Sequence, residues 1–179
     1  LRWEDEELGV VSPARFIPFA EQMGLMPRIG QWVLAQGIRQ LAQWDRVGLR
    51  LPSLSINLSV HQLYDPELVQ TVQRLLALEG IAASRLILEI TESAMMQDPD
   101  VARKRFLALA KLGIRFAVDD FGTGYSSLTY LHAFPLAELK IDRSFVAPLA
   151  EDVADETIVD ATIQIAHRFG MSVVAEGVE

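Results

Sequence analysis

The 179-residue sequence contains no cysteine, and this absence excludes several classes of chemistry at once. Disulfide frameworks, zinc–thiolate sites, iron–sulfur clusters and cysteine nucleophiles all require thiols. Basic residues are also in the minority, because 16 Lys and Arg stand against 24 Asp and Glu and leave a net charge of −8. Such a chain offers no positive field to a nucleic-acid polymer or an anionic membrane. An anionic substrate would have to be held locally, by metal ions or a few basic side chains.

Long apolar runs are missing as well. No apolar stretch approaches the roughly 18 residues of a membrane span, and no signal-peptide pattern is present. Since 50% of the residues are hydrophobic and 22% are charged, the composition excludes a disordered chain. We therefore expect a globular cytoplasmic domain, while a membrane anchor of the parent protein could lie outside this sequence.

Short apolar strands alternate with amphipathic helices along the chain. Five strands are expected, over 54–59, 85–91, 115–120, 136–142 and 171–176. Repeated strand–helix–strand units imply parallel strands joined by right-handed crossovers. The sequence therefore favours an α/β (β/α)8 TIM-type barrel. The alternative is a doubly wound open sheet, which is less favoured because no Gly-rich phosphate loop follows the first strand.

Proline marks the expected helix starts. A capping side chain precedes a proline at three places: Ser12-Pro13, Asp65-Pro66 and Asp98-Pro99. Apolar residues at the helical spacing indicate further helices over 28–46 and after Asp155. The last of these is expected to bury a stripe of Ile158, Thr162, Ile165 and Phe169. The connection after residue 120 leaves room only for a brief helix near 126–131.

Each expected strand carries a polar or ionisable residue near its C-terminal end. These residues are Asn57, Glu89, the pair Asp119 and Asp120, Lys140, and Glu176. Active sites of parallel α/β folds form at this rim. Each residue alone has an ordinary explanation, as a solvated edge residue or a hydrogen-bonded structural amide. Together they would converge in a barrel, where charges must be paired or metal-bound.

The chemistry of these side chains favours a metal site. Carboxylate and amide oxygens are hard ligands, which suit Mg²⁺ or Mn²⁺ better than zinc. The adjacent Asp119 and Asp120 suggest two ions, because one carboxylate can bridge while its neighbour holds the second ion. Paired ions roughly 3.5–4 Å apart are commonly used to hydrolyse phosphoesters. The sequence therefore predicts a two-metal centre that acts on a phosphoester.

Other polar residues near this cluster have two interpretations each. Gly122 and Gly124 follow the two aspartates, in either a tight β–α turn or a loop that acts as a lid or interface. Glu92 is either a partner of that loop's backbone or a solvated acid. Arg2 can hold a phosphate bidentately, although a surface position is the default for a single arginine.

The motifs together resemble the EAL domain, a bacterial module that acts on cyclic di-GMP. The matching segments run in the family's order from end to end of the chain, over 1–3, 11–13, 16–18, 57–59, 89–93, 119–128, 139–142 and 175–179. This resemblance implies a (β/α)8-type barrel. It also implies Mg²⁺- or Mn²⁺-dependent hydrolysis of cyclic di-GMP to the linear dinucleotide pGpG.

The resemblance further implies a role for each residue of the cluster. Asn57, Glu89 and Asp119 would hold the first metal. Asp119 would bridge to a second metal, which Asp120 completes.

The remaining matched residues would act around this centre. Glu176 is similar to the family's acid near the attacking water, described as metal ligand or general base. Lys140 would orient that water or the leaving oxygen, and Arg2 would bind phosphate. The supporting residues would be Glu92, Gly122, Gly124 and Glu179.

Two departures from the family pattern bear on activity. The Glu-Ala-Leu motif should lie at and just before Leu1, and its Glu, a metal ligand in the family, is not in this sequence. The closing strands and helices expected after Glu179 are not in it either, and a typical barrel of this type takes roughly 250 residues. We therefore expect residues 1–179 to be a partial EAL-type barrel whose parent extends beyond both ends, with weak or no catalysis by this segment alone.

Two alternatives to a phosphodiesterase stay open at this point. One is a degenerate EAL module that binds cyclic di-GMP as a receptor without hydrolysing it. The other is an unrelated barrel metalloenzyme, such as an enolase-type lyase. The resemblance also implies a homodimer formed through the region 119–127 and, in the parent, attached GGDEF or sensor domains.

Overall fold

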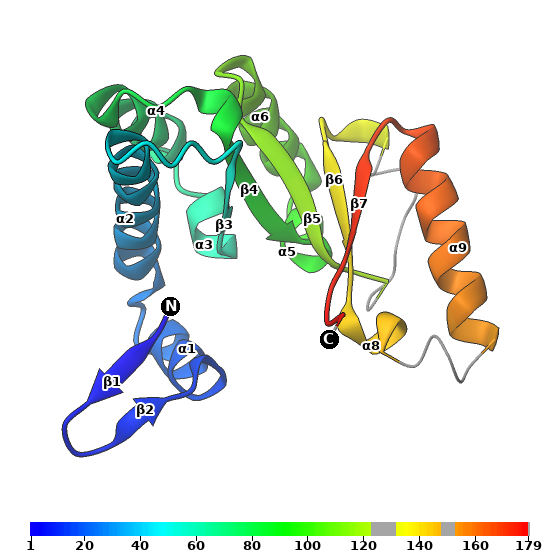
Figure 1. Cartoon of the computed structure of the whole chain (residues 1–179), viewed down its shortest axis with the longest axis horizontal. Coiled ribbons are helices and arrows are strands. Elements are labelled where there is room, and N and C mark those ends of the chain that lie inside the picture. Colours follow the sequence, from blue (N-terminus) through cyan, green and yellow to red (C-terminus); the bar gives the residue numbers. More distant parts are fainter. Residues whose placement is uncertain (123–131, 148–152, 179) are drawn as a thin grey trace.

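The computed structural model describes residues 1–122, 132–147 and 153–178, with the side chains of 153–155 left aside (Figure 1). The chain begins with a hairpin of β1 (Trp3–Asp5) and β2 (Gly9–Val11), followed by α1 (Pro13–Gln22) and α2 (Met26–Arg46). The next elements are β3 (Leu54–Asn57), α3 (Val60–Leu63), α4 (Leu68–Glu79), the short 3-10 helix η1 (Ala83–Arg85) and β4 (Leu86–Thr91). The last are α5 (Glu92–Met96), α6 (Pro99–Lys111), β5 (Arg115–Phe121), β6 (Glu138–Ile141), α8 (Arg143–Val146), α9 (Val153–Arg168) and β7 (Ser172–Ala175).

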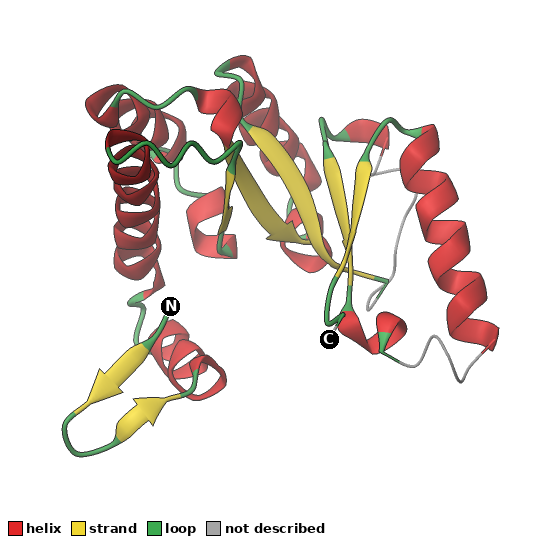
Figure 2. Cartoon of the chain, viewed as in Figure 1, coloured by secondary structure: helices red, strands yellow, loops and turns green. Residues whose placement is uncertain are grey.

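The strands that follow the hairpin form one five-stranded parallel sheet in the order β3-β4-β5-β6-β7 (Figure 2). Each strand pairs with the next strand in sequence, so the chain moves across the sheet in one direction. A doubly wound sheet reverses this direction at a switch point. The order therefore confirms the barrel-type fold, incomplete in this chain, and shows that the doubly wound alternative is wrong.

The core forms where helix stripes meet the buried faces of the strands. Figure 1 shows α2 beside β3 and α9 beside β7, while α4 packs against α2. Leu34, Ile38 and Leu41 of α2 are buried, as the helical spacing predicts. Farther along the sheet, Phe106 of α6 meets Phe116 of β5 with ring centroids 4.5 Å apart. These contacts hold the helices against the sheet and fix the positions of the strand ends.

Two of the three proline-marked helix starts are confirmed. Helix α1 begins at Pro13 and α6 begins at Pro99, and Asp98 caps α6 by accepting a hydrogen bond from the Val101 N–H at 3.1 Å. The start at Asp65-Pro66 was placed two residues too early, because α4 begins at Leu68. Here the Asp65 side chain accepts a hydrogen bond from the Glu67 N–H at 2.9 Å, which forms a turn ahead of the helix.

The buried stripe predicted for α9 is only partly correct. Thr162 is buried, but Ile158 is 43% exposed and Phe169 is 41% exposed, while Val159 and Ala166 are buried instead. Both sets of residues follow a helical spacing, so periodicity alone could not decide between them. The brief helix predicted near 126–131 lies outside the described residues. In the part of the chain that is described, no helix combines the length and apolar character needed to cross a bilayer.

The two confirmed helix starts differ in their caps, because the capping side chain predicted at Ser12 makes no such bond, and this difference allows a matched stability test. Asp98→Ala should lower the free energy of unfolding by about 1 kcal/mol, because it removes a side-chain capping hydrogen bond. Ser12→Ala is the control, since Ser12 precedes Pro13 but makes no side-chain capping hydrogen bond. Urea denaturation followed by circular dichroism measures both. Equal losses in the two variants would contradict the assignment of the α6 cap.

Candidate active site at the carboxyl edge of the sheet

Parallel pairing brings the polar strand ends to one edge of the sheet. Asn57 at the end of β3 pairs with Glu89 of β4. Lys140 of β6 pairs with β7, and Glu176 directly follows that strand, where its N–H donates to the Ile141 carbonyl at 3.1 Å. Residues separated by more than a hundred positions in sequence are therefore neighbours at this edge.

The ammonium group of Lys140 links carboxylates from three neighbouring parts of the sheet. Its Nζ lies 3.1 Å from Glu89 Oε2, 3.0 Å from Asp119 Oδ1 and 2.6 Å from Glu176 Oε1. Burial by itself would lower the pKa of Lys140. The hydrogen bonds to Glu176, Asp119 and Glu89 outweigh burial and raise this pKa above its ordinary value. Lys140 is therefore held as a cation among the acids.

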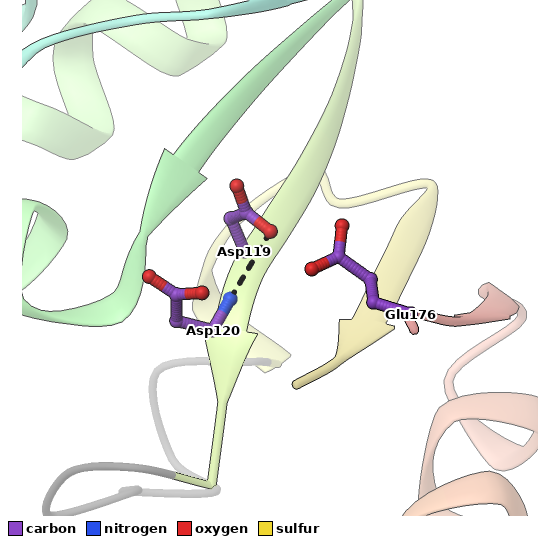
Figure 3. Close-up of side chains that lie close together, drawn as sticks. All are labelled: Asp119, Asp120 and Glu176. Atoms are coloured by element: carbon purple, nitrogen blue, oxygen red, sulfur yellow. Dashed lines mark hydrogen bonds between the residues drawn. The ribbon is translucent and has the colours of Figure 1, made fainter. Parts of the chain in front are cut away.

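Asp119 and Asp120 both face this cluster because the strand is distorted between them. Consecutive residues of a regular strand point to opposite faces. Here Asp120 adopts φ +52°, in the left-handed region, and the pairing of β5 with β6 shifts between Val118 and Phe121. Such a conformation costs roughly 1–3 kcal/mol and tends to occur at functional sites. Figure 3 shows the two carboxylates with Glu176, and the Asp120 N–H donates to Asp119 Oδ1 at 3.2 Å.

Three carboxylates come close enough to share a cation. Asp119, Asp120 and Glu176 each offer an oxygen, and these oxygens lie within 4.8 Å of one another. Burial, followed by the negative charges of Asp119, Asp142 and Glu176, raises the pKa of Asp120, while Lys140 opposes this rise. Crowded acids of this kind gain from a bound cation, and hard oxygen donors fit a divalent ion such as Mg²⁺ or Mn²⁺. Two of these three acids, Asp119 and Asp120, belong to the predicted metal ligands, and the identity of the ion stays open.

The helix α8 supports the turns that follow these acids. Gly122 comes after the two aspartates and Gly177 comes after Glu176, with φ of +98° and +73°. A Cβ at Gly122 would lie 3.1 Å from Phe145 Cε2, and one at Gly177 would lie 2.6 Å from Arg143 Cβ. One short helix therefore packs against both turns. A supporting role was predicted for Gly122 but not for Gly177, although the place of Gly177 directly after Glu176 was a usable signal.

The other predicted site residues lie apart from the close group of three acids. Glu89 reaches that group through Lys140, and Asn57 reaches it through its pairing with Glu89. Arg2 is exposed and precedes β1, whose hairpin is a separate sheet. Among the described residues no hydrogen bond or ion pair joins Arg2 to the cluster, so its role stays a prediction.

The supporting residues are only partly covered by the structure. Glu92 is the first residue of α5 and directly follows Thr91, which ends β4 and is the N-cap of α5. Gly124, Glu179 and the greater part of the region 119–127 lie outside the described residues.

Comparison with known proteins identifies the family. The model of the EAL domain matches residues 1–179. The chain belongs to the EAL domain family. It is 42% identical over 179 residues to the bifunctional diguanylate cyclase/cyclic di-GMP phosphodiesterase MucR of Pseudomonas aeruginosa, covering 100% of this chain and 26% of that protein. It is 41% identical over 179 residues to the cyclic di-GMP phosphodiesterase PA2567 of the same organism, covering 100% of this chain and 30% of that protein.

Solved EAL domains have the same fold. The structure of the MucR phosphodiesterase of P. aeruginosa in complex with c-di-GMP matches with a TM-score of 0.94 and 42% identity, over 99% of this chain and 72% of that one. The EAL domain of Xanthomonas citri FimX in complex with c-di-GMP matches with a TM-score of 0.90 and 28% identity, over 99% of this chain and 70% of that one. In sequence, this EAL chain spans less than a third of the length of each of the two curated relatives.

The role of Lys140 in balancing charge can be tested without any substrate. Lys140→Met should lower the free energy of unfolding of the metal-free protein at neutral pH, by up to roughly 3–5 kcal/mol, because it leaves buried carboxylates without their cation. In the wild type, Lys140 opposes the rise in the pKa of Asp120 that burial and the neighbouring acids cause, so its removal should raise that pKa further. The stability of the variant should therefore fall as pH rises from the unfolded-state pKa of an aspartate, about 4, up to the raised folded pKa of Asp120.

Denaturation curves at several pH values measure this effect. Lys104→Met is the matched control, since Lys104 is exposed on α6. A Lys140→Met variant that is as stable as the control at every pH would show that the ion pairs do not balance the cluster.

Proposed function

We propose that this EAL domain is a phosphodiesterase that hydrolyses cyclic di-GMP to linear pGpG with two Mg²⁺ or Mn²⁺ ions. The observation that carries the proposal is the convergence of Asp119, Asp120 and Glu176 within 4.8 Å of one another, beside the cationic Lys140. Two relatives named as cyclic di-GMP phosphodiesterases and two solved EAL domains in complex with c-di-GMP support the substrate.

The residues of the site divide into metal ligands and groups that act on the reaction. Asn57, Glu89 and Asp119 would hold one ion, and Asp120 would hold the second together with the bridging Asp119. When bound, two divalent ions supply a water with lowered pKa and charge neutralisation at the phosphoryl oxygens. Each ligand comes from an adjacent strand or the turn that follows it, so the sheet sets the spacing of the ligands.

Lys140 and Glu176 would act on the reacting groups. Glu176 would accept the proton of the attacking water or complete the metal site. The ion pairs of Lys140 keep it protonated, so it is suited to donate hydrogen bonds and offset negative charge, and poorly suited to give up a proton. Lys140 would thus orient the water or the leaving oxygen while the water oxygen bonds to phosphorus and one P–O ester bond of the ring breaks, and the proton accepted by Glu176 would be available to the leaving oxygen. Arg2 would hold a phosphate.

A receptor module is the second candidate function. Lys140 already neutralises part of the acidic cluster without any metal, so the site can persist as a binding surface in a protein that does not turn over its ligand. A homodimer through 119–127, attached GGDEF or sensor domains and a cytoplasmic location stay predictions. The bifunctional name of the MucR relative agrees with attached domains.

Turnover by the complete domain separates the two candidates. The protein that carries this chain within the whole domain is incubated with cyclic di-GMP and Mg²⁺ or Mn²⁺, and products are resolved by chromatography. We expect pGpG to accumulate and EDTA to stop the reaction. Tight binding of cyclic di-GMP with no pGpG above background would favour the receptor.

Single changes at the metal ligands test the assignment of the site. Asp119→Asn and Glu89→Gln should each lower the rate of pGpG formation by several orders of magnitude, because metal activation supplies several kcal/mol of transition-state stabilisation. Thermal unfolding is used to show that each variant stays folded. Glu21→Gln, at an exposed acid of α1, is the control and should keep the wild-type rate. Metal-dependent activity retained in either ligand variant would refute the assignment.

A further inference from the structure

The turn after Asn57 is closed by a reciprocal pair of side-chain and backbone hydrogen bonds. The N–H and Oγ of Ser59 each donate to Gln62 Oε1 at 3.1 Å, and the Gln62 N–H donates to Ser59 Oγ at 3.3 Å. This is the capping box of α3, with Ser59 as its N-cap. Gln62 is only 6% exposed, an unusual degree of burial for a glutamine.

A glycine of a different helix makes room for this glutamine. Gly30 lies in α2, and a Cβ at this position would overlap the carboxamide of Gln62. Glycine in the middle of a helix is unfavourable relative to alanine. Gly30 is therefore explained by the space that it leaves, which lets α2 press the Gln62 side chain against the turn that begins at Ser59.

The same turn fixes the backbone of Asn57. The N–H of Leu58 donates to the Glu89 carbonyl at 2.8 Å, and Leu58 is buried. Among the described strands, β3 has a neighbour on one side only, so β4 holds Asn57 from one direction. The capping box fixes the backbone at Ser59, two residues after Asn57, and α2 packs against the Gln62 side chain of the box. Within the described part of the chain, no hydrogen bond restrains the Asn57 side chain itself, so its direction depends on this backbone.

We propose that Gly30, Gln62 and Ser59 form a positioning unit that aims Asn57 at the metal site. The inference rests on the proposed function, because it requires Asn57 to be a metal ligand. Gln62 acts through the Ser59 turn and touches neither the ion nor the substrate, so it is a positioning residue. Removal of a residue that orients a metal ligand without touching the metal typically weakens metal binding by roughly 10–100-fold.

The test compares Mn²⁺ binding in variants of the protein that carries the complete domain. Gln62→Met keeps the length and burial of the side chain but removes the acceptor, and Gly30→Ala displaces the same carboxamide. Each should weaken the calorimetric Kd for Mn²⁺ by roughly 10–100-fold. The KM for cyclic di-GMP at saturating Mn²⁺ should stay at the wild-type value. Gln62→Glu should keep the wild-type Kd for Mn²⁺, since a glutamate side chain can close the same capping box.

Two further variants separate positioning from general stability. Asp98→Ala removes a capping hydrogen bond of α6 at a residue outside the metal cluster, and should leave the Kd for Mn²⁺ unchanged. The double variant of Gly30→Ala and Gln62→Met should bind Mn²⁺ no more weakly than the worse single variant, because both changes break one unit. Urea unfolding is measured for each protein. Gln62→Met, which adds no overlap, carries the test if Gly30→Ala does not fold.

The outcomes distinguish this inference from the proposed function. A wild-type protein that fails to bind Mn²⁺ would overturn both. A wild-type protein that binds Mn²⁺, with Gln62→Met binding equally well, would overturn the positioning unit alone. An equal loss of Mn²⁺ affinity in Asp98→Ala would also overturn it, since the effect would then follow stability and not the position of Asn57.

Discussion

The accumulation of negative charge at one edge of the sheet is the constraint on which the rest of this structure depends. Glu89, Asp119 and Glu176 come from different strands or the turns after them, and each would repel the others if left alone at low solvent exposure. Lys140 lies between them and donates to all three. The sequential strand order is what allows this arrangement, since it sets β6 between β5 and β7. The ammonium group is thus part of the fold as well as of the site.

Parallel topology explains why so much of the site could be predicted from sequence. In a sheet of this kind, the C-terminal end of every strand lies at the same edge. Polar residues at the strand ends are therefore expected to lie close together. Asn57 and Glu89 are paired by register, and Glu176 follows the strand next to Lys140. The apolar periods were enough to find the strands, and the direction of the strands then placed the side chains.

The features that could not be predicted depend on distortions or on contacts between distant segments. Asp119 and Asp120 were both expected in one metal centre, but strand alternation points neighbouring residues to opposite faces, and the left-handed backbone at Asp120 that brings both into the cluster could not be predicted. The buried stripe of α9 was misjudged because two neighbouring stripes have the same period. Nothing local in the sequence links Gly30 to Gln62, because the two residues meet only after α2 packs against α3.

The charge balance also bears on how an acidic chain would bind an anionic dinucleotide. With Lys140 as the cation among Glu89, Asp119, Asp120 and Glu176, the cluster is net negative and repels a phosphodiester. For the residues of this chain, one divalent ion would still leave the sum of formal charges negative, whereas two would not. In the proposed mechanism, a second ion therefore does more than complete the chemistry, because it removes the net negative charge of the site. Substrate attraction would then depend on full metal occupancy, because the net charge of −8 on this chain gives no long-range help.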